Sequence, residues 1–354
     1  MSTHDMSAHG TSAHGMTSHG GGAVGTIRSV VAVEGRIELA SRPRPALAVS
    51  GGAVLVRPTM ALLTPLEREV ARGLGAPAAG ARVLGTSCVG VVEDATQSGG
   101  LLAKGARVAV QPVFACGRCE RCLGGLAMHC GMRTILGIDD AAGGLSELIA
   151  VPTAACVPLA RELDDERAVF AVALARALEA VRRGGVDKTT FASVLGDDLL
   201  AVLATLVAVE ENQYARLVAT SEATLRIGEQ FGIRHRALAE TGRRGDQELV
   251  IDTTGSAETI AAASRMARAR GHVVVAGISA RAPIAVDLSQ IALDEIEIHG
   301  SGFGPLGGAI ERLTRRAIDP SPLVSRRVGL ADAAKGLAML AEPGVFGVLV
   351  QVTR

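Results

Sequence analysis

Strand-length and helix-length segments alternate along the second half of this 354-residue chain. The apolar, helix-like stretch AVFAVALARALEAVRR is followed by the strand-like FASVLG and the helix-like DDLLAVLATLVAVEEN. RLVATS, ATLRIGEQFG, ELVIDTTG, ETIAAASRMARARG and HVVVAGI continue the alternation, with ETIAAASRMARARG read as one helix. Parallel strands need a long crossover, usually a helix, so this pattern indicates βαβ units around a parallel sheet. The sequence predicts a doubly wound α/β domain over about residues 174–303.

The rest of the chain is organised differently. Between about residues 27 and 173, short β segments such as GAVLVRP, GTSCVGVVEDA and ARVAVQPVFA are separated by Gly and Pro, which predicts a β-rich domain. Residues 304–354 carry a helical segment, ADAAKGLAMLAE, and a final strand, GVLVQV. We expect this last segment to return to the first domain. A chain of this length is long enough for two domains with separate cores.

Residues 1–26 have the composition of a disordered tail. His4, His9, His14 and His19 recur every five residues among Gly, Ser, Thr, Ala and Met. Such a segment buries too little apolar surface to offset the entropy of ordering it. Neutral imidazoles bind transition metals, so two interpretations stay open: a weak metal-capture tail, or an inert extension produced by duplication of a short repeat.

Charge and hydropathy exclude several classes of partner. The 36 basic and 36 acidic residues give a formal net charge of zero, with no basic block, which argues against binding to nucleic acid or to anionic membranes. No apolar run has the length of a membrane span, and the N-terminus lacks the pattern of a secretory signal. We therefore predict a cytoplasmic protein.

Four of the six cysteines lie close together in the sequence. Cys116, Cys119, Cys122 and Cys130 have the spacing C-x2-C-x2-C-x7-C, inside a lobe of about residues 112–134. Four thiolates suit a tetrahedral Zn²⁺ ion and leave no open coordination position, so the pattern predicts a structural rather than a catalytic zinc. Free thiols and an iron–sulfur cluster are the alternatives.

These features together resemble the medium-chain dehydrogenase/reductase superfamily, and most closely its zinc-containing alcohol dehydrogenases. GTSCVGVVED is similar to the family's GHExxGxVxx segment, ERAVFAVALARALEAV to its helix at the domain junction, and DEIEIHGS to the strand that closes its cofactor domain. The resemblance covers about residues 27–354. It implies a GroES-like β-rich domain, a Rossmann domain, an NAD(P)-dependent oxidoreductase activity, and a homodimer or homotetramer acting on a small molecule.

The resemblance also shows what is missing from the catalytic site. In the zinc alcohol dehydrogenases a second zinc polarises the substrate oxygen, and its ligands correspond here to Thr64, Thr86, Ser87 and Val172. None of these is an imidazole, thiolate or carboxylate, so the positions do not hold Zn²⁺ against water. The family's proton-relay Ser or Thr corresponds to Leu66. Cys88 beside Ser87 is a candidate replacement ligand, but a lone thiol is more typical of a small buried apolar residue.

The expected cofactor loop is altered as well. The pattern G-x-G-x-x-G/A after the first Rossmann strand reads Gly196-Asp197-Asp198-Leu199-Leu200-Ala201. Asp198 replaces the middle glycine, where the backbone must approach a pyrophosphate. Two like charges about 4 Å apart at an effective dielectric constant of 20 repel by about 4 kcal/mol, and half of that weakens binding more than about tenfold. Equally, both acids suit the capping of an unliganded helix.

The next strand, LVATS, lacks the acid that normally binds the adenosine ribose. With no acid to repel a 2′-phosphate, NADP is favoured over NAD, although no Arg follows at once to hold that phosphate. The resemblance assigns cofactor contacts to seven positions: Gly196, Asp198, Leu199, Leu200, Thr220, Ser221 and Gly277.

Three functions follow from these residues. The first is an alcohol dehydrogenase-like protein with one structural zinc and lost or much reduced activity, serving as a scaffold or regulator. The second is a zinc-independent, NADP-linked reductase of a small carbonyl, quinone or alcohol. The third is a zinc alcohol dehydrogenase with relocated ligands. We favour the first, because most parts needed for hydride transfer are absent.

Overall fold

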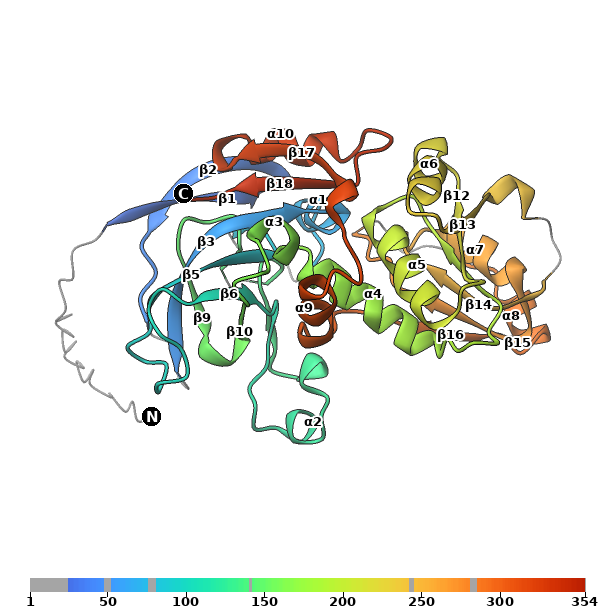
Figure 1. Ribbon diagram of the computed structural model, residues 1–354, viewed down its shortest axis with the longest axis horizontal. Coiled ribbons are helices and arrows are strands. Elements are labelled where there is room, and N and C mark those ends of the chain that lie inside the picture. Colours follow the sequence, from blue (N-terminus) through green and yellow to red (C-terminus); the bar gives the residue numbers. More distant parts are fainter. Residues whose placement is uncertain are drawn as a thin grey trace, which may run out of the picture.

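The computed structural model describes residues 25–47, 52–75, 81–139, 142–241, 245–280 and 285–353. Two bodies lie side by side in Figure 1, one rich in strands and one with helices around a sheet, and helix α4 (Ala171–Gly184) runs between them. The predicted tail and its four histidines lie outside the described residues, apart from Gly25 and Thr26.

The β-rich body contains two main sheets. A three-stranded sheet has the order β2-β1-β4, and a larger sheet runs β10-β6-β5-β3-β18-β17 with β9 paired to β3. The strands before the domain junction are β1 (Thr26–Val33), β2 (Arg36–Pro43), β3 (Ala53–Leu63), β4 (Arg82–Val83), β5 (Cys88–Asp94), β6 (Arg107–Val110), β9 (Ile149–Pro152) and β10 (Cys156–Pro158). Their inward residues form one apolar core with Leu84, Leu136 and Leu145.

The end of the chain is part of this β-rich body. Strand β18 (Gly347–Gln351) pairs antiparallel with β3, and β17 (Val324–Gly329) pairs parallel with β18. Helix α10 (Ala333–Met339) covers both strands, and α9 (Gly307–Thr314) packs on α4. The final segment therefore closes the sheet that the first part of the chain begins.

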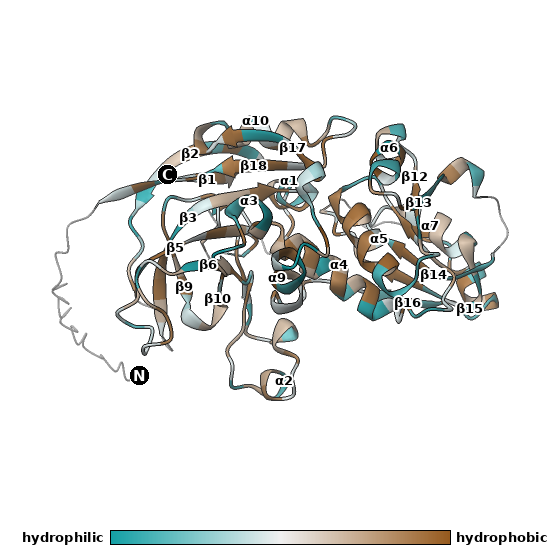
Figure 2. Ribbon diagram, viewed as in Figure 1, coloured by the Kyte–Doolittle hydropathy of each residue, from teal (hydrophilic) through white to brown (hydrophobic). Residues whose placement is uncertain are grey.

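The second body is a parallel six-stranded sheet in the order β13-β12-β11-β14-β15-β16. Figure 2 shows apolar residues concentrated on α5 and on the central strands beneath it. The predicted fold class, a GroES-like domain with a Rossmann domain, is confirmed. The elements are β11 (Ala192–Leu195), α5 (Leu199–Glu211), β12 (Arg216–Ala219), α6 (Glu222–Gln230), β13 (Arg234–Ala237), β14 (Gln247–Asp252), α7 (Ala257–Met266), β15 (Ala267–Val275), α8 (Ser289–Leu293) and β16 (Glu297–Gly300).

Short elements join the larger ones. The remaining helices and strands are α1 (Pro65–Ala71), β7 (Val113–Phe114), α2 (Glu120–Leu123), β8 (Thr134–Ile135) and α3 (Asp165–Ala168). Single 3₁₀ turns are η1 (Ala127–His129), η2 (Thr153–Ala155), η3 (Leu238–Glu240), η4 (Ser321–Leu323) and η5 (Leu330–Asp332). No helix in the described part of the chain is long and apolar enough to cross a membrane.

One predicted helix is too long. ETIAAASRMARARG was expected to be helical throughout, but α7 ends at Met266 and the ARARG stretch belongs to β15. Ala267 is already extended, pairs with Gln247 of β14, and is followed by Arg270 at a φ of 59°. Strand pairing therefore overrides the helical propensity of Ala and Arg at this boundary.

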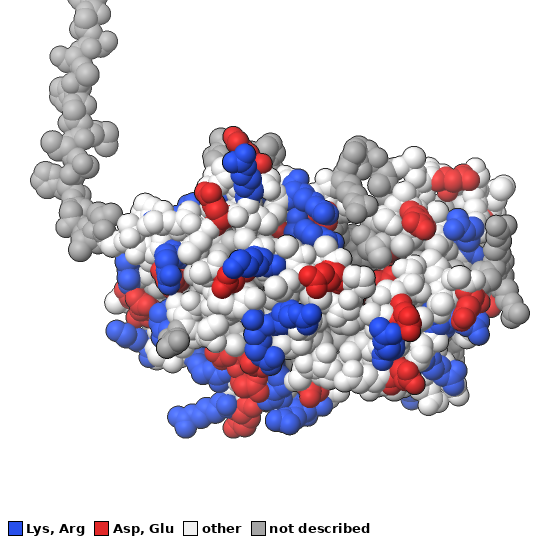
Figure 3. Space-filling view, turned by 90° about the horizontal axis from the view of Figure 1, so that it is seen from above, with Lys and Arg blue, Asp and Glu red and all other residues white. Residues whose placement is uncertain are grey.

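Acidic and basic side chains are interspersed over the face seen in Figure 3. Ion pairs in the described part of the protein include Arg327 with Glu166 at 2.6 Å and Lys335 with Asp332 at 2.7 Å. The described part of this face carries no extended patch of one sign, in keeping with the zero net charge of the sequence.

Candidate functional site

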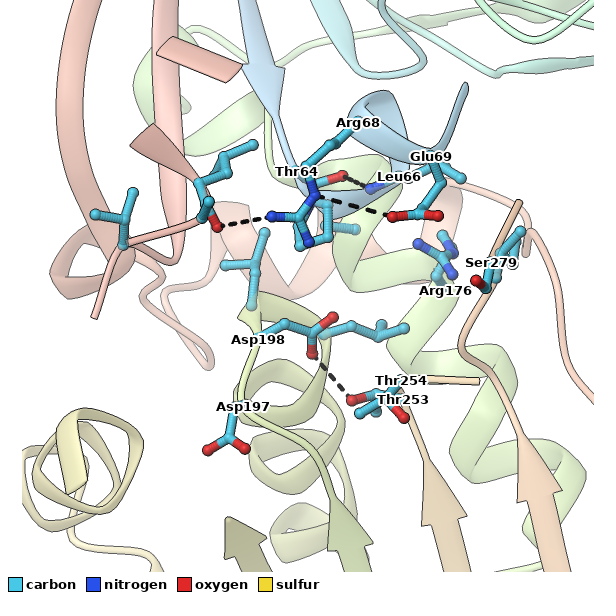
Figure 4. Close-up of a pocket in the computed structure, with 18 of the residues that line it drawn as sticks. Thr64, Leu66, Arg68, Glu69, Arg176, Asp197, Asp198, Thr253, Thr254 and Ser279 are labelled. Atoms are coloured by element: carbon cyan, nitrogen blue, oxygen red, sulfur yellow. Dashed lines mark hydrogen bonds and ion pairs between the residues drawn. The ribbon is translucent and has the colours of Figure 1, made fainter. Parts of the chain in front are cut away.

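A cavity of about 570 Å³ lies between the two bodies. Its walls come from α1, α4, the start of α5, the ends of β12 and β14, and the loop after α10 (Figure 4). All four positions assigned to catalytic zinc ligands line it, namely Thr64, Thr86, Ser87 and Val172, and Leu66 lines it too. The structure thus brings together the residues that the resemblance placed at a metal site, although none of them suits a metal.

A buried carboxylate connects two of these positions. Glu67 on α1 is fully buried. Its Oε2 accepts hydrogen bonds from the Thr64 backbone N–H and hydroxyl, each at 2.8 Å. Its Oε1 accepts from the Thr86 backbone N–H at 3.0 Å and from the Thr86 hydroxyl. Four donors therefore satisfy one carboxylate, with Thr64 also capping α1 through a bond from the Leu66 N–H at 3.3 Å.

The network engages the hydroxyls of two of the assigned ligand positions, Thr64 and Thr86. Both threonine hydroxyls donate to Glu67, so the carboxylate and its partners satisfy one another without a cation. Among the described residues, groups of three or more His, Cys, Asp or Glu ligands occur in two places, and neither lines the cavity. The sequence analysis did not identify Glu67 as a hydrogen-bond acceptor in the site. Glu67 lies in the diverged stretch MALLTPLERE, and its partner Thr86 is nineteen residues away.

Asp198 occupies the start of helix α5. Its side chain accepts hydrogen bonds from the Ala201 N–H and the Thr253 hydroxyl, both at 2.9 Å. Figure 4 shows the carboxylate pointing across the floor of the cleft toward Thr253. Burial raises the pKa of Asp198, while these hydrogen bonds and the nearby Arg176 oppose the shift. The helix end is thus capped by the protein's own acid.

Asp197 binds the end of the next strand. Its carboxylate accepts from the backbone N–H groups of Thr220 at 3.1 Å and Ser221 at 2.7 Å, and from the Thr220 hydroxyl at 2.5 Å. These are the residues that follow β12, where a Rossmann protein normally places its ribose-binding acid. An acid from the glycine loop therefore already accepts from the N–H groups at the end of this strand.

The other predicted cofactor residues divide into two groups. Asp198, Leu199, Leu200, Thr220 and Ser221 line the cavity. The two glycines do not: a Cβ on Gly196 would lie 2.0 Å from the Thr253 hydroxyl oxygen, and one on Gly277 would lie 2.2 Å from the Gly255 nitrogen. Both therefore allow close packing of loops beneath the cleft rather than contact with a ligand.

Arg176 is a cleft residue that the sequence analysis missed. It lies on α4 one turn after Val172 and is buried, with 9% of its surface exposed. Its Nη2 donates to the Ala276 carbonyl at 2.9 Å, while its Nε has no hydrogen-bond partner. Burial lowers the pKa of Arg176, opposed by the carboxylates of Asp198 and Glu67. The one available signal was a charged residue within the apolar stretch AVFAVALARAL.

The titration of Asp198 gives a testable pH effect. Because burial raises its pKa above the unfolded value of about 3.9, the folded state binds this proton more tightly. The corresponding stability is complete below about pH 4 and is lost as the pH rises through the raised pKa. Asn keeps the helix cap without this titration. The measured quantity is the free energy of urea unfolding of Asp198→Asn minus that of the wild type. We expect this difference to be more positive at about pH 7 than at about pH 4. An equal difference at the two pH values would contradict the prediction.

The cysteine lobe lies away from the cleft, between β7 and β8 (Figure 1). The four Sγ atoms of Cys116, Cys119, Cys122 and Cys130 lie within 4.8 Å of one another, with measured separations of 3.9, 3.5 and 3.8 Å for three of the pairs. Four sulfurs at about 2.3 Å from a tetrahedral ion lie about 3.8 Å apart. The geometry therefore fits one zinc ion with four thiolate ligands.

Two of the thiols, Cys116 and Cys122, differ in acidity. Backbone N–H groups of Arg118 and Cys119 lower the pKa of Cys116 to about 6, whereas burial and the neighbouring thiols raise the pKa of Cys122 to about 12. The Cys122 thiol therefore resists ionisation in this arrangement when no cation is bound. A bound Zn²⁺ supplies the charge that holds them together as thiolates.

Cys88 is a small buried residue rather than a ligand. Only 2% of its surface is exposed, and burial raises its pKa to about 12. Its sulfur would lie 2.9 Å from a Cβ added to Gly144, so it fills a tightly packed part of the core. It belongs to neither described group of candidate metal ligands.

Comparison with known proteins agrees with the fold. Residues 50–161 match the alcohol dehydrogenase GroES-like domain. The chain is 25% identical to a sorbitol dehydrogenase of Arabidopsis thaliana over 71% of its length and 73% of the relative, and 26% identical to an L-idonate 5-dehydrogenase of Vitis vinifera over 69% and 71%.

Solved structures give the same result for the fold. The alcohol dehydrogenase TADH from Thermus sp. ATN1 superimposes with a TM-score of 0.81 at 21% identity, covering 92% of this chain and 100% of that one. The alcohol dehydrogenase RspB from Escherichia coli CFT073, complexed with NADH, superimposes with a TM-score of 0.81 at 21% identity. The superposition covers 92% of this chain and 99% of that one. This chain therefore carries an alcohol dehydrogenase GroES-like domain at residues 50–161, and its sequence and fold are similar to those of zinc-containing alcohol dehydrogenase-like proteins of the medium-chain dehydrogenase/reductase superfamily.

Proposed function

We propose that this protein is an alcohol dehydrogenase-like scaffold or regulatory protein that binds one structural zinc and has lost most or all hydride transfer. The observation that carries the proposal is the Glu67 network, in which two of the four catalytic ligand positions donate hydrogen bonds to a buried carboxylate. The interdomain cavity remains large enough for a small-molecule ligand.

The donor chemistry of the cleft does not fit a catalytic zinc. Zn²⁺ in proteins takes Cys, His, Asp or Glu ligands. Thr64 and Thr86 use their hydroxyl protons on Glu67, Ser87 adds one further hydroxyl, and Val172 offers no donor. These four positions therefore do not hold a metal ion that could act as a Lewis acid on a substrate oxygen. Leu66, at the relay position, has no group that transfers a proton.

The cleft does not fit a dinucleotide either. A pyrophosphate binds N–H groups at the start of a helix, but the Ala201 N–H already donates to Asp198. The N–H groups of Thr220 and Ser221 already donate to Asp197. A dinucleotide must displace both carboxylates and approach their charge. The protein's own acids thus occupy the places of the cofactor's phosphate and ribose.

The cysteine lobe does fit its metal. Cys116, Cys119, Cys122 and Cys130 would hold a single zinc with all coordination positions filled by protein, so the ion supplies cross-linking rather than chemistry. Backbone N–H groups of Cys116 and Met132 point to the Cys130 sulfur at 3.5 and 3.3 Å and stabilise its negative charge. This assigns the zinc a structural role.

Titration with nicotinamide cofactors tests the proposal. We expect neither NADPH nor NADH to bind the wild type in the micromolar range, as followed by nucleotide fluorescence and thermal shift. Asp198→Gly removes the carboxylate and its bulk, so NADPH affinity should rise by about tenfold or more. Asp198→Asn removes the charge but keeps the helix cap, and therefore separates repulsion from steric exclusion.

Two results would overturn this interpretation. Micromolar binding of NADPH to the wild type, with reduction of a quinone or enone, would establish the zinc-independent reductase instead. Oxidation of a polyol that is abolished by a chelator would establish a metal-dependent dehydrogenase. If affinity stays equally low in Asp198→Gly, Asp198 is not the obstacle, and Asp197 is the next residue to replace.

A further inference from the structure

The edge of the Rossmann sheet carries a second cluster of metal-ligating side chains. His272 lies on β15, and Glu297 and His299 lie on the edge strand β16. The parallel register places His272 opposite Glu297, and His299 follows two residues later on the same face. Pairing of these two strands, rather than proximity in the sequence, brings the three groups together.

The distances in this cluster suit a small divalent cation. Oε2 of Glu297 lies 3.6 Å from Nδ1 of His272 and 3.2 Å from Nε2 of His299. The ligand atoms of all three residues lie within 4.8 Å of one another. Ligands at about 2.0–2.1 Å from tetrahedral zinc are about 3.3–3.4 Å apart. We propose that His272, Glu297 and His299 form a second zinc site, with water as the fourth ligand.

Hydrogen bonding alone accounts less well for this arrangement. The separation of His272 and Glu297 exceeds the length of a normal hydrogen bond, so the carboxylate does not bind both rings in that way. The two rings lie 5.6 Å apart between centroids and are inclined by 39°, so they do not stack. Many zinc sites instead use this donor set, in which neutral imidazoles and one carboxylate converge on one ion.

The cluster is accessible and separate from the other sites. The side chains of His272, Glu297 and His299 are 40%, 62% and 28% exposed, so an ion can enter from solvent without rearrangement of the core. None of the three lines the cleft, and none belongs to the cysteine lobe. The site is therefore independent of the proposed loss of hydride transfer.

A bound ion would connect the edge strand to its neighbour. Strand β16 is held by pairing to β15 on one side only. A metal joining His272 to Glu297 and His299 adds a cross-strand link at this open edge, and a ligand that binds only the folded state stabilises it. Zinc should therefore raise the melting temperature of the protein.

The test uses the full-length, zinc-loaded protein with His4, His9, His14 and His19 replaced by Gln, because these histidines can bind metal themselves. Calorimetric titration with Zn²⁺ should show one binding event beyond the zinc that copurifies. We expect His272→Ala and His299→Ala each to abolish it and Glu297→Gln to weaken it. His235→Ala on the exposed strand β13 serves as the matched control and should retain it.

A spectroscopic measurement identifies the ligands. Co²⁺ added to the same zinc-loaded protein should give visible d–d bands without a thiolate charge-transfer band, and these bands should vanish in His272→Ala. Circular dichroism without added metal checks that each variant is folded. The proposal is wrong if no Zn²⁺ binding is detected up to millimolar concentration, or if binding persists unchanged in both histidine variants.

Discussion

Replacing Cys130 by Ser is expected to release the zinc that we propose for the cysteine lobe and to unfold the lobe between β7 and β8. Cys130 is fully buried and accepts backbone N–H bonds from Cys116 and Met132, so its loss removes a metal ligand and the centre of the loop's polar contacts. The lobe has little else to hold it: α2 has no buried residues and the β7–β8 pairing is short. Structural zinc contributes about 10–16 kcal/mol of apparent folding free energy in small zinc domains.

Zinc content by mass spectrometry and limited proteolysis of residues 113–135 measure this effect. We expect one tightly held zinc in the wild type, almost none in Cys130→Ser, and rapid cleavage within the lobe of the variant. Cys156→Ala is the matched control, since Cys156 is a buried cysteine outside the cluster and should keep the zinc. Iron in place of zinc, with visible absorption, would show a cluster instead. Retention of zinc by Cys130→Ser would contradict the assignment.

Replacing Glu67 by Ala should destabilise the protein by about 3–5 kcal/mol. The change leaves the hydroxyls and backbone N–H groups of Thr64 and Thr86 without their acceptor in a buried environment. It also removes half of the capping box at the start of α1. Each unsatisfied buried donor costs about 1–3 kcal/mol, with partial relief where water enters from the cleft.

Urea unfolding at neutral pH measures this difference. Glu67→Gln keeps one carbonyl acceptor and should fall between the wild type and Glu67→Ala. Glu229→Ala on the exposed side of α6 is the control and should change stability by less than about 0.5 kcal/mol. If Glu67→Ala were as stable as Glu229→Ala, the network would not be a fixed part of the fold, and its role in closing the catalytic position would be wrong.

The fold was predictable because it depends on patterns that repeat. Strands β11, β12, β14 and β15 of the Rossmann sheet each carry an apolar run, and helices α5, α6 and α7 each have a buried face. Strand β13, with sequence RHRA, was missed because it lies at the sheet edge and its first three residues are exposed. The end of α7 was misplaced because ARAR is compatible with a helix until β14 pairs with it.

The chemistry of the cleft was only partly predictable. Resemblance to the family's motifs assigned the four ligand positions and Asp198, because each motif is a short stretch of sequence. Motifs did not indicate Glu67, whose acceptor role depends on Thr86, or the edge cluster of His272, Glu297 and His299, which depends on strand register. Contacts between segments distant in sequence leave no periodic signal in a single chain.

The pairing of β18 with β3 also determines the order in which this protein can fold during synthesis. Strands β5 and β9 pair with β3 early, but Val348 lies opposite Leu63, so the C-terminal end of β3 gains its β18 partner only when nearly the whole chain has been made. By contrast, every strand of the parallel sheet is complete once Gly300 has left the ribosome. The body with the parallel sheet can thus fold while translation continues. The β-rich body contains the first strands to be made, but it is completed last. A nascent chain stalled before β17 and β18 would leave the apolar end of β3, from Met60 to Leu63, without its β18 partner, and such open edges are prone to pair with other chains.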